Sequence, residues 1–131
     1  MEAQSPRHVN ELFAIPGRIA LVTGGSRGLG LQIAEALGEA GATVVLTARR
    51  AGEMDSACRA LASRGITAHA IAGDAADAED IARVCRSTLE VHGHIDILVN
   101  NAGASWGAPA EEHPLASWDK VMNLNVRGVF V

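Results

Sequence analysis

Short runs of consecutive apolar residues alternate along this chain with longer segments in which apolar residues recur every three or four positions. The runs are typical of strands that are buried on both faces, and the spaced pattern is typical of amphipathic helices. The predicted strands are residues 19–23, 43–48, 66–71 and 95–99. The predicted helices are residues 31–41 and 53–63, a segment around 81–89 that ends at Gly93, and a last helix that contains residues 123–128. The predicted buried stripe of the first helix consists of Leu29, Ile33, Ala36, Leu37 and Ala40.

This alternation of strands and helices predicts an α/β fold of the Rossmann type, a doubly wound parallel sheet of which about four strands lie in this chain. Parallel neighbours require crossover helices, and right-handed crossovers place helices on both faces of the sheet. The turn signal Pro16-Gly17 separates a polar N-terminal arm, residues 1–16, from one domain over residues 17–131. The arm carries a small apolar patch, at Leu12, Phe13 and Ile15, which predicts one docking point.

Composition narrows the classes of function. Hydrophobic residues at 48% and charged residues at 20% fit a globular domain and exclude a disordered chain. A formal net charge of −4 with scattered arginines argues against a nucleic-acid partner.

No apolar stretch approaches the length of a membrane span and no signal-peptide core is visible, so we expect a cytoplasmic protein with no membrane partner. Cys58 and Cys85 are expected to be reduced structural thiols, and the five histidines lack the spacing of metal ligands, so no metal site is predicted.

A glycine-rich segment, residues 23–30, lies between the first predicted strand and the first predicted helix. Glycines allow the backbone to approach a ligand closely, and a helix N-terminus attracts anions, so this order predicts a phosphate cradle. Gly24, Gly28 and Gly30 give the spacing G-x-x-x-G-x-G. A P-loop is excluded because Leu31 rather than Lys follows the last glycine, and G-x-G-x-x-G also fails. A glycine-rich turn without a ligand is the alternative.

Three motifs together make the chain resemble the classical short-chain dehydrogenase/reductase family from about residue 17 to residue 131. They are Thr-Gly-Gly-Ser-Arg-Gly-Leu-Gly at 23–30, Asn-Asn-Ala-Gly at 100–103 and Asn-Leu-Asn-Val-Arg-Gly at 123–128. The resemblance is nearest to the 3-oxoacyl-acyl-carrier-protein reductase-like and gluconate 5-dehydrogenase-like members. It implies an NAD(P)-binding Rossmann domain over residues 17–131 and hydride transfer between a ketone and a secondary alcohol, with a small carbonyl or alcohol molecule as substrate.

The resemblance also implies roles for individual residues. The pyrophosphate and adenosine would be lined by Gly24, Ser26, Gly28, Leu29 and Gly30, with Thr23 tying the loop to neighbouring backbone. Asp74 would accept from the adenine amino group beside Ala75, and Asn101, Ala102 and Gly103 would pass the nicotinamide ribose. Asn125 would hold a water in the catalytic proton relay. The alternatives are a turn-forming or helix-capping Asp74, a plain turn at Asn101, and an Asn125 that satisfies helix backbone.

The end of the second predicted strand bears on the choice of cofactor. An NAD site places a carboxylate there to accept from the ribose 2′-OH, whereas a 2′-phosphate favours Arg. This chain has Ala48 followed by Arg49, and Arg27 in the glycine loop is a second cation. We therefore expect NADP(H), with NAD(H) as the alternative. The arginines could instead be solvated surface charges, Arg50 above all.

The catalytic Ser, Tyr and Lys that the resemblance implies are not found. The chain contains no Tyr, and its only Lys, Lys120, precedes Asn125, so no Tyr-x-x-x-Lys motif can be written. We therefore expect a domain truncated within its last helix and inactive alone. The apolar terminal helix predicts a homo-oligomer, dimer or tetramer, when the protein is intact. The competing hypothesis is a non-catalytic dinucleotide-binding or interaction module.

Overall fold

The computed structural model describes residues 8–131. Its centre is a four-stranded sheet in the order β3-β2-β1-β4, and every neighbouring pair is parallel. The strands are β1 (Ile19–Thr23), β2 (Thr43–Ala48), β3 (Ala68–Ala72) and β4 (Ile97–Val99). The predicted α/β doubly wound sheet of Rossmann type is therefore confirmed.

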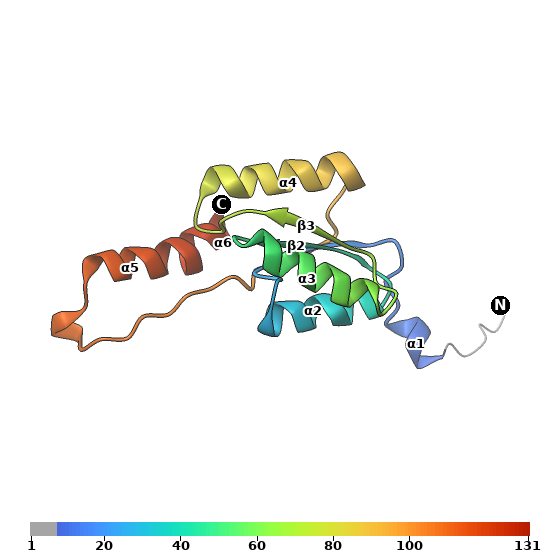
Figure 1. The fold of residues 1–131 in the computed structure, drawn as a ribbon, viewed down its shortest axis with the longest axis horizontal. Helices are drawn as coiled ribbons and strands as arrows, with labels where there is room; N and C mark the ends of the chain where they lie inside the picture. Colours follow the sequence, from blue (N-terminus) through green and yellow to red (C-terminus); the bar gives the residue numbers. More distant parts are fainter. Residues whose placement is uncertain (1–7) are drawn as a thin grey trace, which may run out of the picture.

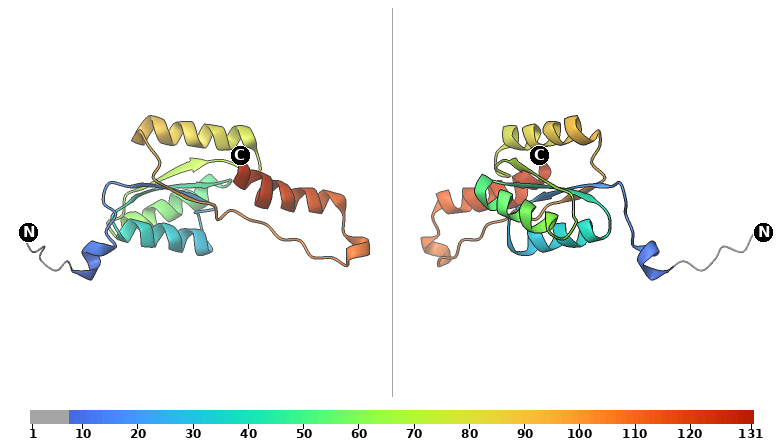
Figure 2. Two further views of the ribbon diagram at one scale, coloured as in Figure 1. Left: turned by 180° about the vertical axis from the view of Figure 1, so that it is seen from behind. Right: turned by 45° about the vertical axis from the view of Figure 1, so that its right-hand side comes forward.

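Helices cover both faces of this sheet, as Figures 1 and 2 show. The helices α2 (Gly28–Glu39) and α3 (Ala51–Ala62) lie on one face, and α4 (Ala78–His92) lies on the other. Each face has its own core because successive strand residues point to opposite sides. Val22, Val44 and Leu46 pack on the side of α2 and α3, whereas Leu21 and Val45 pack on the side of α4. The uninterrupted apolar runs thus form strands that are buried on both faces.

The two central strands have the predicted bounds, and the two edge strands are shorter than predicted. β3 begins at Ala68 because the N–H of Ile66 donates to Leu61 O at 3.1 Å, in the turn that closes α3. β4 begins at Ile97 because the carboxylate of Asp96 accepts from the N–H of Ile19 at 2.8 Å, so a side chain takes the place of a backbone partner. Local hydrogen bonds therefore shorten both edges.

The predicted inward stripe of the first helix is wrong at Leu29 and Ala36, whereas Leu37 packs against the core as predicted. Helix α2 starts at Gly28, before the predicted residue 31, and its fully buried positions are Gly30 and Ala34. Leu29 is 65% exposed and Ala36 is also exposed. The cause is the tight approach of Gly30 to the glycine loop, because a Cβ at Gly30 would overlap the carbonyl oxygen of Gly24. This contact sets the rotation of the helix.

The N-terminal arm lies partly outside the described residues, which begin at His8. It contains the short helix α1 (Val9–Leu12). The N–H of Ile15 donates to Ala40 O at 2.7 Å, and the Ile15 side chain packs against the core. Leu12 and Phe13 are 60% and 74% exposed, so within the predicted patch the contact with the core belongs to Ile15.

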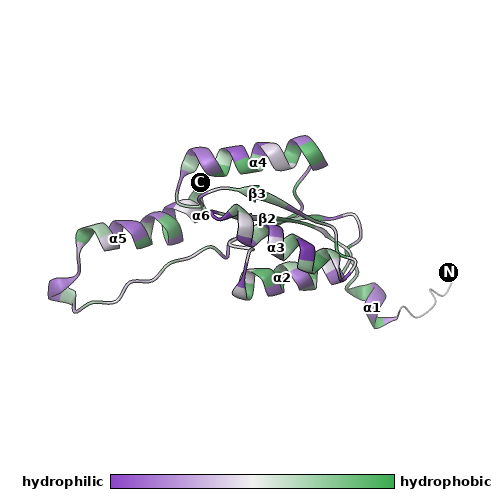
Figure 3. Cartoon of the chain, viewed as in Figure 1, coloured by the Kyte–Doolittle hydropathy of each residue, from purple (hydrophilic) through white to green (hydrophobic). Residues whose placement is uncertain are grey.

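The segment after β4 leaves the sheet and returns to it. It passes through η1 (Ala110–Glu112) and forms a helix in three parts, namely α5 (Leu115–Met122), the π-helix η2 (Asn123–Arg127) and α6 (Gly128–Phe130). Figure 1 shows α5 projecting beyond the carboxyl edge of the strands, and Figure 3 shows hydrophobic residues along it. Leu115, Trp118 and Phe130 are 80%, 55% and 91% exposed. This helix therefore presents apolar side chains to solvent.

Candidate functional site

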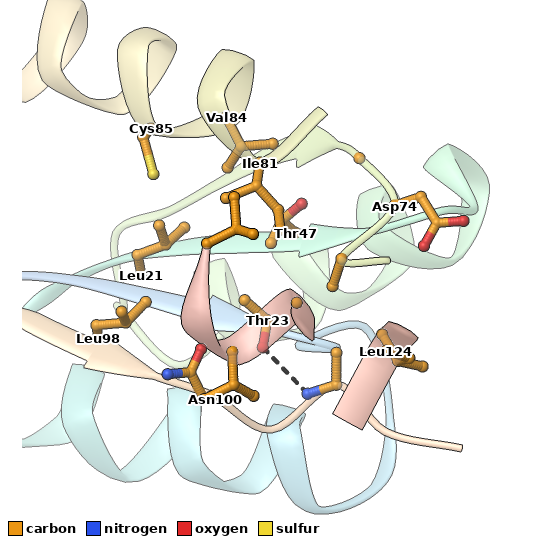
Figure 4. Close-up of a pocket in the computed structure, with 16 residues that line it drawn as sticks. Leu21, Thr23, Thr47, Asp74, Ile81, Val84, Cys85, Leu98, Asn100 and Leu124 are labelled. Carbon is orange, nitrogen blue, oxygen red and sulfur yellow. Dashed lines mark hydrogen bonds between the residues drawn. The ribbon is translucent and has the colours of Figure 1, made fainter. Parts of the chain in front are cut away.

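The loops that follow the four strands surround one open cavity of about 330 Å³ at the carboxyl edge of the sheet. This is the edge at which ligands of doubly wound sheets bind. Its lining contains most of the residues predicted for the cofactor, namely Gly24, Ser26, Arg27, Gly28, Arg49, Asp74, Ala75, Asn101, Ala102 and Gly103. Figure 4 shows a smaller apolar pocket beside it, to which Leu21, Val84, Cys85, Leu98 and Leu124 contribute.

Thr23 and Asn101 tie the glycine loop to the end of β4. The hydroxyl of Thr23 donates to Val99 O at 3.2 Å and accepts from the N–H groups of Asn101 and Ala102, both at 3.0 Å. The side-chain amide of Asn101 donates to Thr23 O at 3.0 Å and to Gly24 O at 3.1 Å. Asn101 is thus more than a plain turn residue, because its amide holds the loop after β1 against the loop after β4.

The three spaced glycines of the loop meet different requirements. Gly24 and Gly28 adopt left-handed conformations, with φ of 65° and 56°. A Cβ at Gly24 would also lie 3.0 Å from the Asn101 amide nitrogen. A Cβ at Gly30 would overlap both that nitrogen and the Gly24 carbonyl oxygen. The spacing G-x-x-x-G-x-G therefore lets the backbone fold around the Asn101 side chain.

The N-terminus of α2 opens toward this loop with few side-chain partners. Arg27 occupies the N-cap and makes no capping hydrogen bond, and the first turn contains no acidic residue. The first N–H groups of a helix have no intrahelical acceptor, and the helix dipole adds partial positive charge there. The arrangement fits a bound phosphate group, which would accept from these N–H groups.

One end of the cavity is rich in cations. Arg27, Arg49 and Arg50 line it, and their residues are exposed. Arg50 donates to Glu53 at 2.6 Å, and Ser26 donates to the other oxygen of Glu53 at 3.4 Å. The Arg50 guanidinium, chiefly through its hydrogen bond, lowers the pKa of Glu53, and the charge of Arg27 adds to this effect. Glu53 was not among the predicted site residues, because a Glu in the first turn of a helix is commonplace.

Asp74 lies between β3 and α4 and lines the same cavity as the arginines. Its Oδ1 accepts from the N–H of Ala76 at 2.9 Å, which is the bond of an Asx turn. The N-cap of α4 is Asp77, whose side chain accepts from the N–H of Asp80. The helix-capping alternative for Asp74 is therefore wrong. The turn-forming alternative describes its bonding, and the residue lines the cavity as well.

Asn125 lies in the π-helix η2, a geometry that is rare and frequent at functional sites. Its side chain forms two hydrogen bonds with the backbone of Ala104, accepting from the N–H at 2.9 Å and donating to the carbonyl at 2.8 Å. The alternative in which Asn125 satisfies its own helix backbone does not describe these bonds. Asn125 instead fixes the backbone at Ala104, next to Gly103 of the cavity lining.

Three further residues shape the site and were missed in the sequence. Thr47 is 6% exposed, and its hydroxyl has no hydrogen-bond partner among the described residues. A Cβ at Gly73 would lie 3.3 Å from that hydroxyl, and one at Gly128 would overlap Ala75 O. Gly128 stands in the motif at 123–128, so its spacing was a usable signal. Thr47 was hidden within an apolar run, where a threonine is typical of a strand.

The titratable side chains outside the cavity are the groups to compare with the requirements of a metal site, within the described part of the chain. Among residues 8–131, no three His, Cys, Asp or Glu side chains gather as metal ligands would. His69 and His92 lie with their ring centroids 5.0 Å apart, and burial lowers the pKa of His92.

Cys58 and Cys85 are free and half-buried. Burial also raises the pKa of the Cys58 thiol, so this sulfur is a poor ligand and a poor nucleophile. In the same part of the chain, no helix combines the length and the apolar character that a membrane crossing requires.

The comparisons with known proteins agree with this geometry. The family model described as short chain dehydrogenase matches residues 18–131. The rhamnolipids biosynthesis 3-oxoacyl-[acyl-carrier-protein] reductase of Pseudomonas aeruginosa is 47% identical over 118 residues, which are 90% of this chain and 46% of the relative. The chain therefore spans about half the length of this curated relative.

Solved structures give the same picture. A Pseudomonas aeruginosa RhlG/NADP active-site complex matches with a TM-score of 0.85 at 47% identity, over 90% of this chain and 46% of that chain. A gluconate 5-dehydrogenase from Burkholderia cenocepacia, in complex with NADP and tartrate, matches with a TM-score of 0.87 at 35% identity, over 94% and 48%. Both kinds of relative that the motifs had suggested are thus among the similar proteins.

Proposed function

This chain belongs to the short-chain dehydrogenase family, and on that premise we propose that it is the cofactor-binding half of an NADP(H)-dependent oxidoreductase that interconverts a ketone and a secondary alcohol. The observation that carries the proposal is the cavity at the carboxyl edge of the sheet, where an uncapped helix N-terminus meets the exposed Arg27 and Arg49. The helix N-terminus fits a pyrophosphate, and the arginines fit a 2′-phosphate.

The proposal assigns the dinucleotide along the length of the cavity. The pyrophosphate would lie on the N–H groups of the glycine loop, and the 2′-phosphate would lie between Arg49 and Arg27. Asp74 and Ala75 would border the adenine, and the segment from Asn101 to Gly103 would border the nicotinamide ribose. The two similar structures that contain NADP support the choice of NADP(H) for this chain. NAD(H) remains the competing cofactor.

The proposal also divides the chemistry between two parts of a protein. When bound, the nicotinamide would exchange a hydride with a carbonyl or alcohol carbon. Asn125 would support the proton relay from its place beside Ala104. A Ser, a Tyr and a Lys that orient the carbonyl and move its proton would come from outside these 131 residues, since the chain has no Tyr. The 131 residues alone would bind the cofactor without turning over a substrate.

Two measurements on the protein isolated from its source test this division. The first is its intact mass, which should be about twice the 13.6 kDa of this chain. The second is NADPH oxidation with 3-oxoacyl thioesters and keto sugar acids as substrates, which we expect for at least one of these classes. A mass of 13.6 kDa together with dinucleotide binding and no turnover would favour the competing function, a non-catalytic dinucleotide-binding or interaction module.

The apolar helix at residues 115–130 supports a further part of the proposal, a homo-oligomer. Leu115, Trp118 and Phe130 are large side chains that are more than half exposed and lie on one continuous helical segment. Exposed apolar clusters of this kind mark interaction surfaces. Light scattering of the intact protein should give the mass of a dimer or tetramer, and a monodisperse monomer would contradict this part.

A further inference from the structure

Glu53 is a carboxylate that lines the cavity together with Arg27, Arg49 and Arg50, and it bridges two segments that are distant in sequence. It lies in the first turn of α3. Its Oε1 accepts from Arg50 at 2.6 Å, and its Oε2 accepts from Ser26 in the glycine loop at 3.4 Å. Two-thirds of its side chain is shielded from solvent. Both oxygens are therefore held by donors that line the cavity.

We propose that Glu53 is a specificity-determining residue that competes with the 2′-phosphate of NADP(H) for the donors at this end of the cavity. The inference rests on the proposed function, because it concerns the same dinucleotide site. In the free protein, the carboxylate takes the Arg50 guanidinium and the Ser26 hydroxyl. A bound 2′-phosphate needs donors of this kind and meets a negative charge beside them. Glu53 thus reduces the factor by which the site binds NADP(H) more tightly than NAD(H).

The charges around the cavity give the direction of this effect. Arg27, Arg49 and Arg50 supply three positive charges to the cavity lining, and Glu53 and Asp74 subtract two, with Glu53 the carboxylate that is paired to Arg50. A phosphate monoester carries about −1.5 to −2 at neutral pH. Repulsion between Glu53 and this group acts on NADP(H), whereas NAD(H) has an uncharged hydroxyl at the same position. Neutralising Glu53 should therefore tighten NADP(H) and leave NAD(H) nearly unchanged.

An opposite role for Glu53 is also chemically reasonable and makes a different prediction. A carboxylate that accepts from the ribose hydroxyls would favour NAD(H). Its neutralisation would then weaken NAD(H) and leave NADP(H) unchanged. The hydrogen bonds to Arg50 and Ser26 favour competition, because Glu53 already engages donors that a 2′-phosphate would use.

The test is calorimetric titration of the wild-type protein, Glu53→Gln and Asp55→Asn with NADP⁺ and with NAD⁺. Gln keeps the size of the side chain and removes its charge. Asp55→Asn removes one charge from the same helix, at an exposed residue outside the cavity lining, and controls for net charge. Thermal unfolding of each variant shows whether it is folded. Adenosine 2′,5′-bisphosphate, titrated in parallel, restricts the readout to the adenosine end.

We expect Glu53→Gln to bind NADP⁺ and the bisphosphate on the order of tenfold more tightly, with NAD⁺ within about twofold of wild type. Asp55→Asn should match wild type for all three ligands. A wild type that binds NADP⁺ with no gain in Glu53→Gln, or an equal gain in Asp55→Asn, overturns the role of Glu53 and leaves the proposed function standing. Absence of dinucleotide binding in every variant overturns both.

Discussion

The two ends of the cavity are built in different ways. At the glycine loop, backbone groups and the part-buried Thr23 and Asn101 are joined by hydrogen bonds of 3.0 to 3.2 Å, and two glycines leave no room for a Cβ. At the cationic end, the arginines are exposed, and Arg50 forms an ion pair with Glu53. The difference teaches that hydrogen bonds and close packing fix the loop end, whereas the cationic end consists of exposed charged side chains.

This contrast separates two kinds of experimental effect. Changes at the loop end should weaken every dinucleotide and lower stability together, because shape and folding are coupled there. Changes at the cationic end should alter the ratio of the two cofactors with little effect on stability, because exposed ion pairs contribute little to folding. Variants that mix these effects would break the comparison.

The largest effect is expected for Gly30→Ala. Alanine favours a helix by roughly 1 kcal/mol over glycine, but its Cβ would overlap the Gly24 carbonyl oxygen, which cannot rotate away. We expect the free energy of unfolding to fall by about 2 kcal/mol, and both NADP⁺ and NAD⁺ to bind at least about tenfold more weakly. Chemical denaturation and calorimetry measure the two. Gly107→Ala is the matched control, because its Cβ would meet open space.

A smaller loss is expected for Asn101→Ala. This change removes the donors to the Thr23 and Gly24 carbonyl oxygens and leaves both without that partner. The free energy of unfolding should fall by about 1 kcal/mol, and the two dinucleotides should weaken by similar factors. A variant that weakens only one dinucleotide would show that Asn101 contacts the cofactor selectively and does not simply hold the loop.

At the amino ends of the strands, away from the cavity, replacing Asp96 should change stability without changing dinucleotide binding. There, the Ile19 N–H, together with the Arg18 guanidinium, lowers the pKa of Asp96. A carboxyl group with a lowered pKa stabilises the fold above its unfolded pKa of about 3.9, and this contribution is lost as pH falls through the folded value. Denaturation from pH 7 to pH 3 should therefore be less pH-dependent in Asp96→Asn than in wild type. Equal pH dependence in both proteins would count against this role.

The fold was predictable where neighbouring residues decide it. The bounds of β1 and β2 follow from uninterrupted apolar runs, and both are correct. The starts of β3 and β4 depend on the turn bond of Ile66 and on the Asp96 carboxylate, and these are contacts that hydrophobicity does not encode. The rotation of α2 depends on Gly30 meeting Gly24, a contact across a turn that the stripe of apolar residues did not show.

The candidate site was predictable in its residues and less so in its bonds. Spaced motifs brought the glycine loop, Asp74 and Asn101 to one edge, and the structure places them around one cavity. The Asn101 amide donates to Thr23 O and Gly24 O, which lie 78 and 77 positions earlier in the sequence. No local pattern in the sequence reveals such distant bonds. Glu53 was missed for the same reason, since its partner Ser26 lies 27 positions away.

The central claim is that the cationic end selects NADP(H), and Arg49→Ala tests it most directly. Calorimetric titration of wild type and Arg49→Ala with NADP⁺ and NAD⁺ gives the ratio of affinities in each protein. We predict that wild type binds NADP⁺ more tightly, and that Arg49→Ala weakens NADP⁺ by about tenfold while NAD⁺ stays within about twofold. Equal affinities of wild type for the two cofactors, or equal losses in Arg49→Ala, would contradict the claim.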